Sequence, residues 1–197
     1  MSAGEGTATG EAMSLKIALM RSIVINGQRV KMADARALAE QVGGTDVQSI
    51  IATGNLVFRS SKAPRTLERE LEAACEAFYG RATEIVVKTD AQWRSLLAAN
   101  PFGTEAVQAP ARLLVWAMRT PLPDAGLEQL KRRSIGEELI ERTVDGDFYI
   151  WFGRGNISAS KIPAGFGLKA LGAVGTNRNW NTALKIARAL DEMAGWC

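Results

Sequence analysis

The stretch VQSIIATGNLVF, which runs from Val47 to Phe58, decides the fold of this chain. Residues 47–52 and 56–58 are mostly apolar or β-branched, and the tripeptide Thr53-Gly54-Asn55 lies between them. Two such runs joined by a short turn that contains Gly and Asn are typical of a β-hairpin. The stretch therefore predicts two neighbouring strands of an antiparallel sheet.

Strand and helix patterns alternate regularly on both sides of this hairpin. The expected elements are, in chain order, a strand at 16–20, a helix at 31–42, the hairpin, a helix at 65–79 and a strand at 83–88. This is the order of the ferredoxin-like, or split βαβ, unit. A linking helix capped by Asp90 is expected to follow and to end at Asn100-Pro101.

The second half of the chain repeats this pattern. Asp145-Gly146, a strong turn signal, separates the segments 138–144 and 148–152 and predicts a second hairpin. The other expected elements are a strand at 112–118, a helix from Pro121 through Leu130, a loop at 153–161, a short helix near 163–172 and a final helix at 179–193. We therefore expect an α+β protein with two ferredoxin-like halves, each a mostly antiparallel sheet with helices packed on one face.

The expected organisation has three parts. Residues 1–14 lack the basic and apolar regions of a signal peptide, and their Gly, Ala, Thr and Ser content predicts a disordered tail. Residues 15–100 are predicted to form the N-terminal half. Residues 110–197 are predicted to form the C-terminal half with its long final helix. The halves resemble each other in pattern and not in sequence.

Composition excludes several classes of function. The longest apolar run, Leu113 to Met118, is 6 residues, whereas a membrane helix needs roughly 18 or more. The 197 residues contain no histidine, which excludes Ser-His-Asp triads, Cys-His dyads and His-ligated metal sites. The sequence predicts no metal and no cofactor, and it assigns no catalytic residue.

The chain is mildly basic. Its formal charge is +3, and because Glu5 and Glu11 are the charged residues among the first 14, the remainder carries +5. This is far from the charge stripe of a dedicated DNA-binding protein. The two cysteines, Cys75 and Cys197, are too few and too far apart for a disulfide framework, which favours a cytoplasmic setting.

Five strings, taken together in this order and spacing, carry a family resemblance. They are Lys31-Met32, residues 53–58, Asn100-Pro101-Phe102, residues 148–151 leading to Ser160-Lys161, and residues 177–182. The chain resembles domain-of-unknown-function family 1697 over nearly all of residues 15–190. The resemblance implies a bacterial cytoplasmic protein with a two-part α+β fold and no established activity. The chain departs from the family pattern at Arg21–Gly27, where the family usually carries Arg-Gly-Ile-Asn and two glycines.

Two polar strings are candidate anion sites. Residues 178–182 are predicted to open the final helix, where free N–H groups and the helix dipole favour a phosphate or carboxylate. The alternative is a helix cap at Asn177 or Asn179, with Trp180 anchored in the core. The loop 153–161 combines glycines, hydroxyls and two bases that suit phosphate oxygens, although a surface turn explains it equally well. Residues 165–170 fit Gly-x-Gly-x-x-Ala, but with no preceding strand we reject a dinucleotide fingerprint.

Aromatic residues alternate along the strand at 148–152. Alternation directs Phe148 and Ile150 to one face and Tyr149 and Trp151 to the other, which Trp116 is expected to join from a neighbouring strand. Exposed rings on such a sheet stack nucleic-acid bases. The sequence favours the alternative, packing of these rings against the other half or the last helix.

The leading hypothesis is a metal-free binding protein for an anionic ligand, a nucleotide or short nucleic acid, in a basic cleft between the halves. The predicted ligand-binding residues, with Lys185 at the rim, are Arg21, Lys31, Arg154, Gly155, Ser160, Lys161, Arg178, Asn179 and Asn181. One alternative is a histidine-free enzyme for a phosphorylated or carboxylated small molecule, with Lys161 or Arg178 stabilising negative charge. The other is an interaction module whose aromatic face meets a partner protein.

Overall fold

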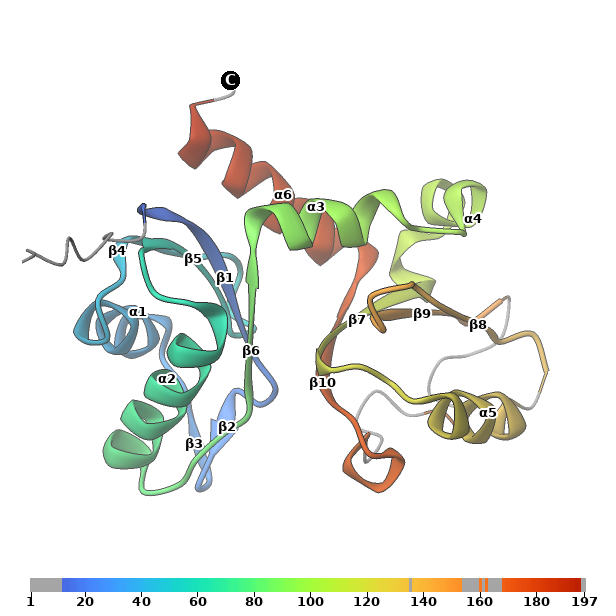
Figure 1. Ribbon diagram of the computed structural model, residues 1–197, viewed down its shortest axis with the longest axis horizontal. Coiled ribbons are helices and arrows are strands. Elements are labelled where there is room, and N and C mark those ends of the chain that lie inside the picture. The colour runs from blue at the N-terminus through green and yellow to red at the C-terminus, as the bar shows by residue number, and fades with distance from the viewer. Residues whose placement is uncertain (1–11, 135, 154–159, 161, 163–167, 196–197) are drawn as a thin grey trace, which may run out of the picture.

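Two antiparallel four-stranded sheets lie side by side, each with helices on its faces (Figure 1). The computed structural model describes residues 12–134, 136–153, 160, 162 and 168–195. In both sheets the strand that comes first in the chain is central, and its two neighbours are the third and the last. This is the ferredoxin-like order, so the expected α+β fold with two such halves is confirmed.

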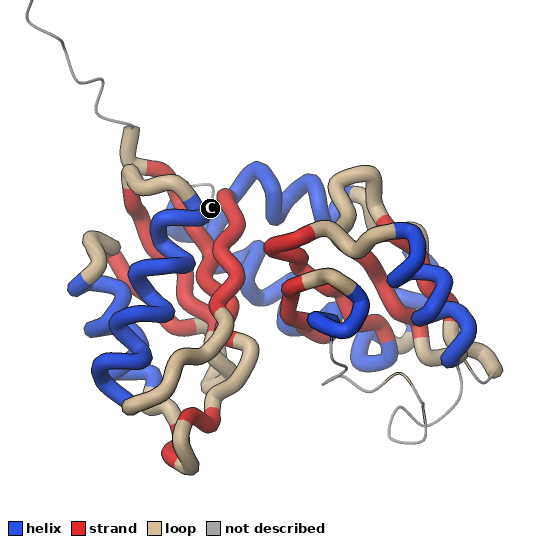
Figure 2. Tube along the Cα trace, turned by 60° about the horizontal axis from the view of Figure 1, so that its bottom comes forward, coloured by secondary structure: helices blue, strands red, loops and turns tan. Residues whose placement is uncertain are grey.

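The N-terminal sheet has the order β4-β5-β1-β6. Its strands are β1 (Ser14–Met20), β4 (Thr45–Ser49), β5 (Asn55–Ser60) and β6 (Ile85–Thr89). Helices α1 (Met32–Gln41) and α2 (Pro64–Tyr79) cover its outer face, as Figures 1 and 2 show. Met20 and Phe58 from the sheet pack there against Leu38 and Leu71 from the helices. Gly80, in the left-handed conformation, ends α2.

A small hairpin of β2 (Val24–Ile25) and β3 (Gln28–Arg29) follows β1. The two turn residues, Asn26 and Gly27, have φ angles of 50° and 75°. Such a turn favours Asn-Gly, because both positions need a left-handed backbone. The sequence pattern predicts no element between the strand at 16–20 and the helix at 31–42, although Asn26-Gly27 is a turn signal.

The C-terminal sheet has the order β10-β7-β9-β8. Its strands are β7 (Leu113–Thr120), β8 (Leu139–Arg142), β9 (Phe148–Trp151) and β10 (Val174–Asn179). Helix α5 (Asp124–Arg133) and the 3₁₀ turn η3 (Leu168–Leu171) cover one face. Strand β10 was not expected, because its sequence VGTNRN lacks apolar alternation.

Helices α3 (Asp90–Ala98) and α6 (Trp180–Ala194) lie between the two halves, and α4 (Gly103–Gln108) and the 3₁₀ turn η1 (Pro110–Arg112) connect them (Figure 1). One core cluster contains Ile17 from the first sheet, Val115 from the second, and Trp93 and Ile186 from the helices. The halves therefore share buried apolar area. The division at residues 100–110 stays a prediction.

The cap of one helix differs from the sequence prediction, and the cap of another agrees with it. Thr89, not Asp90, caps α3, since its hydroxyl accepts a hydrogen bond from the Gln92 N–H at 3.1 Å. At α6 the side chain of Asn179 accepts from the Thr182 N–H at 2.9 Å, so the expected cap at this helix is confirmed.

The aromatic faces correct one expectation. Trp116 is directly opposite Phe148 in the register of β7 and β9, and the two rings stack with centroids 5.2 Å apart. Residues directly opposite share a face, so Trp116 lies on the face opposite to Tyr149. Tyr149 is buried between the halves, where its hydroxyl donates to the Leu96 carbonyl. The packing interpretation is confirmed for Tyr149 and Trp151, which pack in the cluster that the two halves share, whereas Trp116 packs within the C-terminal half. Because Trp116 and Tyr149 are buried, the exposed aromatic face of the interaction-module hypothesis is wrong.

We expect Gly146→Ala to lower the free energy of unfolding by about 3 kcal/mol. Gly146 has φ = +84°, and a Cβ there would collide with the Cβ of Pro121 and lie 2.9 Å from its Cα. Gly27→Ala is the matched control, because Gly27 has φ = +75° and no atom within 4 Å of such a Cβ. Gly27→Ala should lower the free energy of unfolding by only about 1 kcal/mol, because alanine is strained in the left-handed conformation. If urea denaturation showed the same loss of unfolding free energy for both variants, the collision with Pro121 would not be the cause.

None of the helices in the residues that the structure describes has the length and apolar character needed to cross a bilayer. Residues 1–11, most of the predicted tail, lie outside the described residues.

Candidate functional site

A cavity of about 410 Å³ lies where β1 ends and β6 begins. Met20 pairs with Ile85 in the sheet, so the residues just beyond them meet, and the Arg21 N–H donates to the Glu84 carbonyl at 2.9 Å. The loop after β1 and residues 81–84 form most of the wall, and Lys169 on η3 closes it from the other half. The cavity is therefore built by both halves.

A second cavity of about 540 Å³ adjoins the first. The two share Ala82, Thr83, Glu84 and Lys169 as a common wall. Together they form what we call the inter-half cleft, whose charged lining among the described residues is Arg21, Arg65, Arg81, Arg119, Lys169, Glu72 and Glu84. Five cationic side chains thus face two carboxylates.

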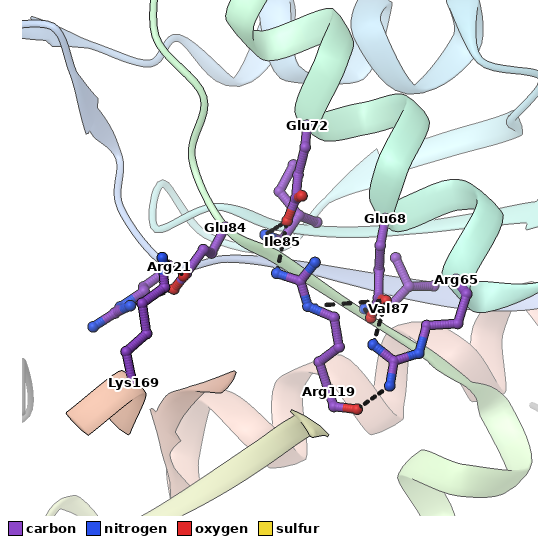
Figure 3. Close-up of polar contacts among 9 residues, drawn as sticks. All are labelled: Arg21, Arg65, Glu68, Glu72, Glu84, Ile85, Val87, Arg119 and Lys169. Atoms are coloured by element: carbon purple, nitrogen blue, oxygen red, sulfur yellow. Dashed lines mark hydrogen bonds and ion pairs between the residues drawn. The ribbon is translucent and has the colours of Figure 1, made fainter. Parts of the chain in front are cut away.

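Glu84 lines both cavities of the cleft, and its side chain lies beside those of Arg21 and Lys169 (Figure 3). Its carboxylate accepts from Arg21 through Oε2 and from Lys169 through Oε1, the latter at 2.7 Å. Burial pushes the pKa of Glu84 up, but the hydrogen bonds from Lys169 and Arg21 outweigh burial and hold that pKa below its usual range. Glu84 is therefore ionised at neutral pH.

Arg81 is a cation of the cleft that is free to meet a ligand. It is exposed, and it forms no hydrogen bond or ion pair with another of the described residues. Since no acid on the described part of the chain neutralises it, its full charge faces the cleft.

The far end of the cleft is an ion-pair network between α2 and β7 (Figure 3). Arg119 donates to Glu72 at 2.8 Å, and Arg65 donates to Glu68 at 3.3 Å and to the Arg119 carbonyl. Burial raises the pKa of Glu68, although the Val87 N–H and Arg119 act in the opposite direction. These arginines hold the halves together, and they are more committed to protein partners than Arg81 is.

Arg178 has a different environment from the one expected. It lies on β10, not in the first turn of α6, and all five of its N–H groups donate to protein oxygens. Its partners in the other half include the Met20 carbonyl at 2.8 Å and the Gly54 carbonyl at 3.2 Å. Burial lowers the pKa of Arg178 to about 10. Arg178 therefore links the two halves by hydrogen bonds, and it does not line the described cavities.

The other predicted residues are dispersed. Lys31, Asn181 and Lys185 are exposed, Asn179 caps α6, and the Ser160 hydroxyl donates to Glu138 at 2.7 Å. Arg154, Gly155 and Lys161 lie outside the described residues. Of the predicted set, Arg21 is the described residue that lines the cleft, and the ligand-binding roles of the set stay predictions.

Sequence reasoning missed Arg81, Glu84, Arg119 and Lys169. The first two had a usable signal, because the ferredoxin-like order places the first and last strands side by side, so the loop after one meets the loop before the other. Arg119 and Lys169 come from the second half, and no local pattern links them to the first. Within the described ranges, no group of three or more His, Cys, Asp or Glu side chains could hold a metal ion.

A family model described as "Protein of unknown function (DUF1697)" matches residues 13–149. This chain belongs to the DUF1697 family. The match confirms the resemblance carried by the sequence strings. Arg21, Arg81, Glu84 and Arg119 of the cleft fall inside the matched segment, whereas Lys169 falls outside it.

The DUF1697 chain has the fold of a conserved bacterial protein from Streptococcus pneumoniae. The two share 21% sequence identity with a TM-score of 0.69, and the likeness covers 91% of this chain and 99% of the other. A second solved structure, a candidate transcriptional repressor of the glycine cleavage system, has 11% identity and a TM-score of 0.20 over 84% of this chain and 95% of that one, too low to support any argument. No curated protein matches significantly.

Proposed function

We propose that this protein binds a small anionic ligand, phosphorylated and of about nucleotide size, in the inter-half cleft. One observation carries the proposal: two adjoining cavities, built by both halves, have five cationic and two acidic side chains among their described lining. Guanidinium and ammonium groups are the donors that suit phosphate oxygens.

The size of the cleft supports a small molecule. Its cavities measure about 410 and 540 Å³, within the range of roughly 300–1,000 Å³ common for small-molecule sites. A nucleic acid needs a longer basic track, and the formal charge of +3 is low for a polymer-binding protein.

The residues of the cleft have distinct parts in this proposal. Arg81 and Arg21 contact the anionic group from the N-terminal half, and Lys169 contacts it from the C-terminal half. Arg178 is a positioning residue, because its bond to the Met20 carbonyl holds the backbone immediately before Arg21. Ligand binding therefore depends on the relative placement of the two halves.

We expect Arg81→Ala to weaken binding of ATP or inorganic pyrophosphate about ten-fold or more, since it removes one charge-assisted contact. Isothermal titration calorimetry measures the affinity, and ligand-induced thermal shift provides a second readout. Arg188→Ala is the matched control, because Arg188 is an exposed arginine of α6 away from the cleft lining. Neither substitution should change the melting temperature without ligand.

Three outcomes separate the alternatives. Equal affinities for Arg81→Ala and Arg188→Ala would place the anion elsewhere and overturn the proposal. Salt-sensitive retention of oligonucleotides without binding of ATP or pyrophosphate would favour nucleic acid instead. Turnover of the bound ATP in the same assay would support the histidine-free enzyme over a binding protein.

A further inference from the structure

The Glu84 carboxylate is positioned as a bound anion would be. One of its oxygens accepts from Arg21 and the other from Lys169, so it bridges cations of the two halves (Figure 3). A phosphate or carboxylate group of a ligand that used both cations would make the same two contacts. Ligand and Glu84 therefore need the same donors.

The side chain of Glu84 is separate from the part of the residue that maintains the sheet edge. Its backbone carbonyl accepts from the Arg21 N–H, whereas its carboxylate lies in the wall common to both cavities. The Glu84 side chain is 18% exposed, but that of Lys169 is 71% exposed. A ligand can reach the ammonium group from solvent while the carboxylate stays mostly enclosed.

We propose that Glu84 is an internal competitor, whose carboxylate occupies the anion position of the cleft until a ligand takes Arg21 and Lys169 from it. This inference rests on the proposed function, and it predicts which anions the cleft accepts. A singly charged carboxylate offers the two cations no more charge than Glu84 does. A dianionic phosphate offers about twice the charge and displaces Glu84 favourably. Glu84 thereby makes the cleft selective for phosphorylated ligands over monocarboxylates.

The test is Glu84→Gln, which keeps the shape of the side chain and removes its charge. We expect this variant to bind inorganic pyrophosphate about ten-fold more tightly than the wild type, because a like charge no longer opposes the ligand. We also expect acetate, which gains nothing by displacing Glu84 in the wild type, to bind measurably to this variant. Calorimetric titration of both probes measures the two effects. Glu76→Gln is the matched control, because Glu76 is an exposed acid of α2 outside the cleft lining.

Glu84→Asp is the second variant, for the case in which Glu84→Gln does not fold. A carboxylate one methylene shorter cannot reach both cations in the same way, so pyrophosphate should again bind more tightly. Unchanged or weaker binding by the folded Glu84 variants, with wild-type binding intact, would overturn the competitor and leave the proposed function standing. Absence of pyrophosphate and ATP binding by the wild type and by every Glu84 variant would overturn both.

Discussion

Replacement of Arg178 by alanine is expected to lower the free energy of unfolding by about 3–5 kcal/mol. All five guanidinium N–H groups of Arg178 donate to protein oxygens. Among the acceptors in the other half are the Met20 carbonyl and the side-chain oxygen of Asn55, which is itself fully buried. Alanine would leave these acceptors without their donor at a site that water reaches poorly. Denaturation in urea measures the loss.

Arg178→Lys separates geometry from charge. An ammonium group has three donors and lacks the planar fork, so it cannot serve acceptors in both halves at once. We therefore expect lysine to restore less than half of the lost free energy. Lys185→Ala, an exposed lysine of α6, is the control and should lie within about 0.5 kcal/mol of the wild type. Full rescue by lysine would show that charge, and not the fork, ties the halves together.

We expect Asp147→Ala to lower the free energy of unfolding by about 3–5 kcal/mol. Asp147, which precedes β9, accepts from the Lys88 ammonium of β6 at 2.8 and 3.0 Å and from the Met118 N–H at 2.6 Å. The side chains of Lys88 and Asp147 are 10% and 6% exposed. Alanine at position 147 leaves a buried ammonium group without a counter-charge and a strand N–H without an acceptor. Thermal and urea unfolding at pH 7 measure the effect.

The companion variant Lys88→Met makes stability depend on pH in a defined direction. Burial already raises the pKa of Asp147, against the opposing effects of Lys88 and of the Met118 N–H. Loss of Lys88 raises that pKa further, so the folded variant binds a proton more tightly than the unfolded chain. The contribution of Asp147 to the stability of this variant should be greatest below about pH 4, the ordinary carboxyl range, and should be lost as pH rises to the folded-state pKa.

The double variant Lys88→Met, Asp147→Leu removes both charges together and should recover most of the stability lost by Asp147→Ala. A double variant as unstable as the single one would show that packing, and not the unpaired charge, accounts for the loss.

Much of the fold was predictable because its signals are local. The apolar period of α2 and the turn residues around Gly54 and Gly146 are features of short stretches, and the structure has the helix and both hairpins there. Strand β10 escaped prediction because its residues are mostly polar and its pairing with β7 supplies the order that its sequence does not signal. Trp116 was placed on the wrong face because strand register decides which rings share a face, and register involves a partner strand.

The candidate site was predictable only in part. Arg21 was predicted as a ligand-binding residue from the sequence. Its neighbours Arg81 and Glu84 follow from the adjacency of β1 and β6. Lys169 and Arg119 reach the cleft from the second half, at chain distances over which a periodic pattern carries no information.

Helices, hairpins and the strand order of the N-terminal half were encoded in residue periodicity, because backbone hydrogen bonding and the alternation of side chains act over a few neighbouring positions. The contacts between charged groups far apart in the chain were not encoded in this way. Arg178 and the Met20 carbonyl are 158 positions apart, and Lys88 and Asp147 are 59 apart. Their pairing depends on how two sheets and the helices between them bury apolar surface, a property of the packed whole. Packing of the halves thus decided which cations face the cleft and which hold the molecule together.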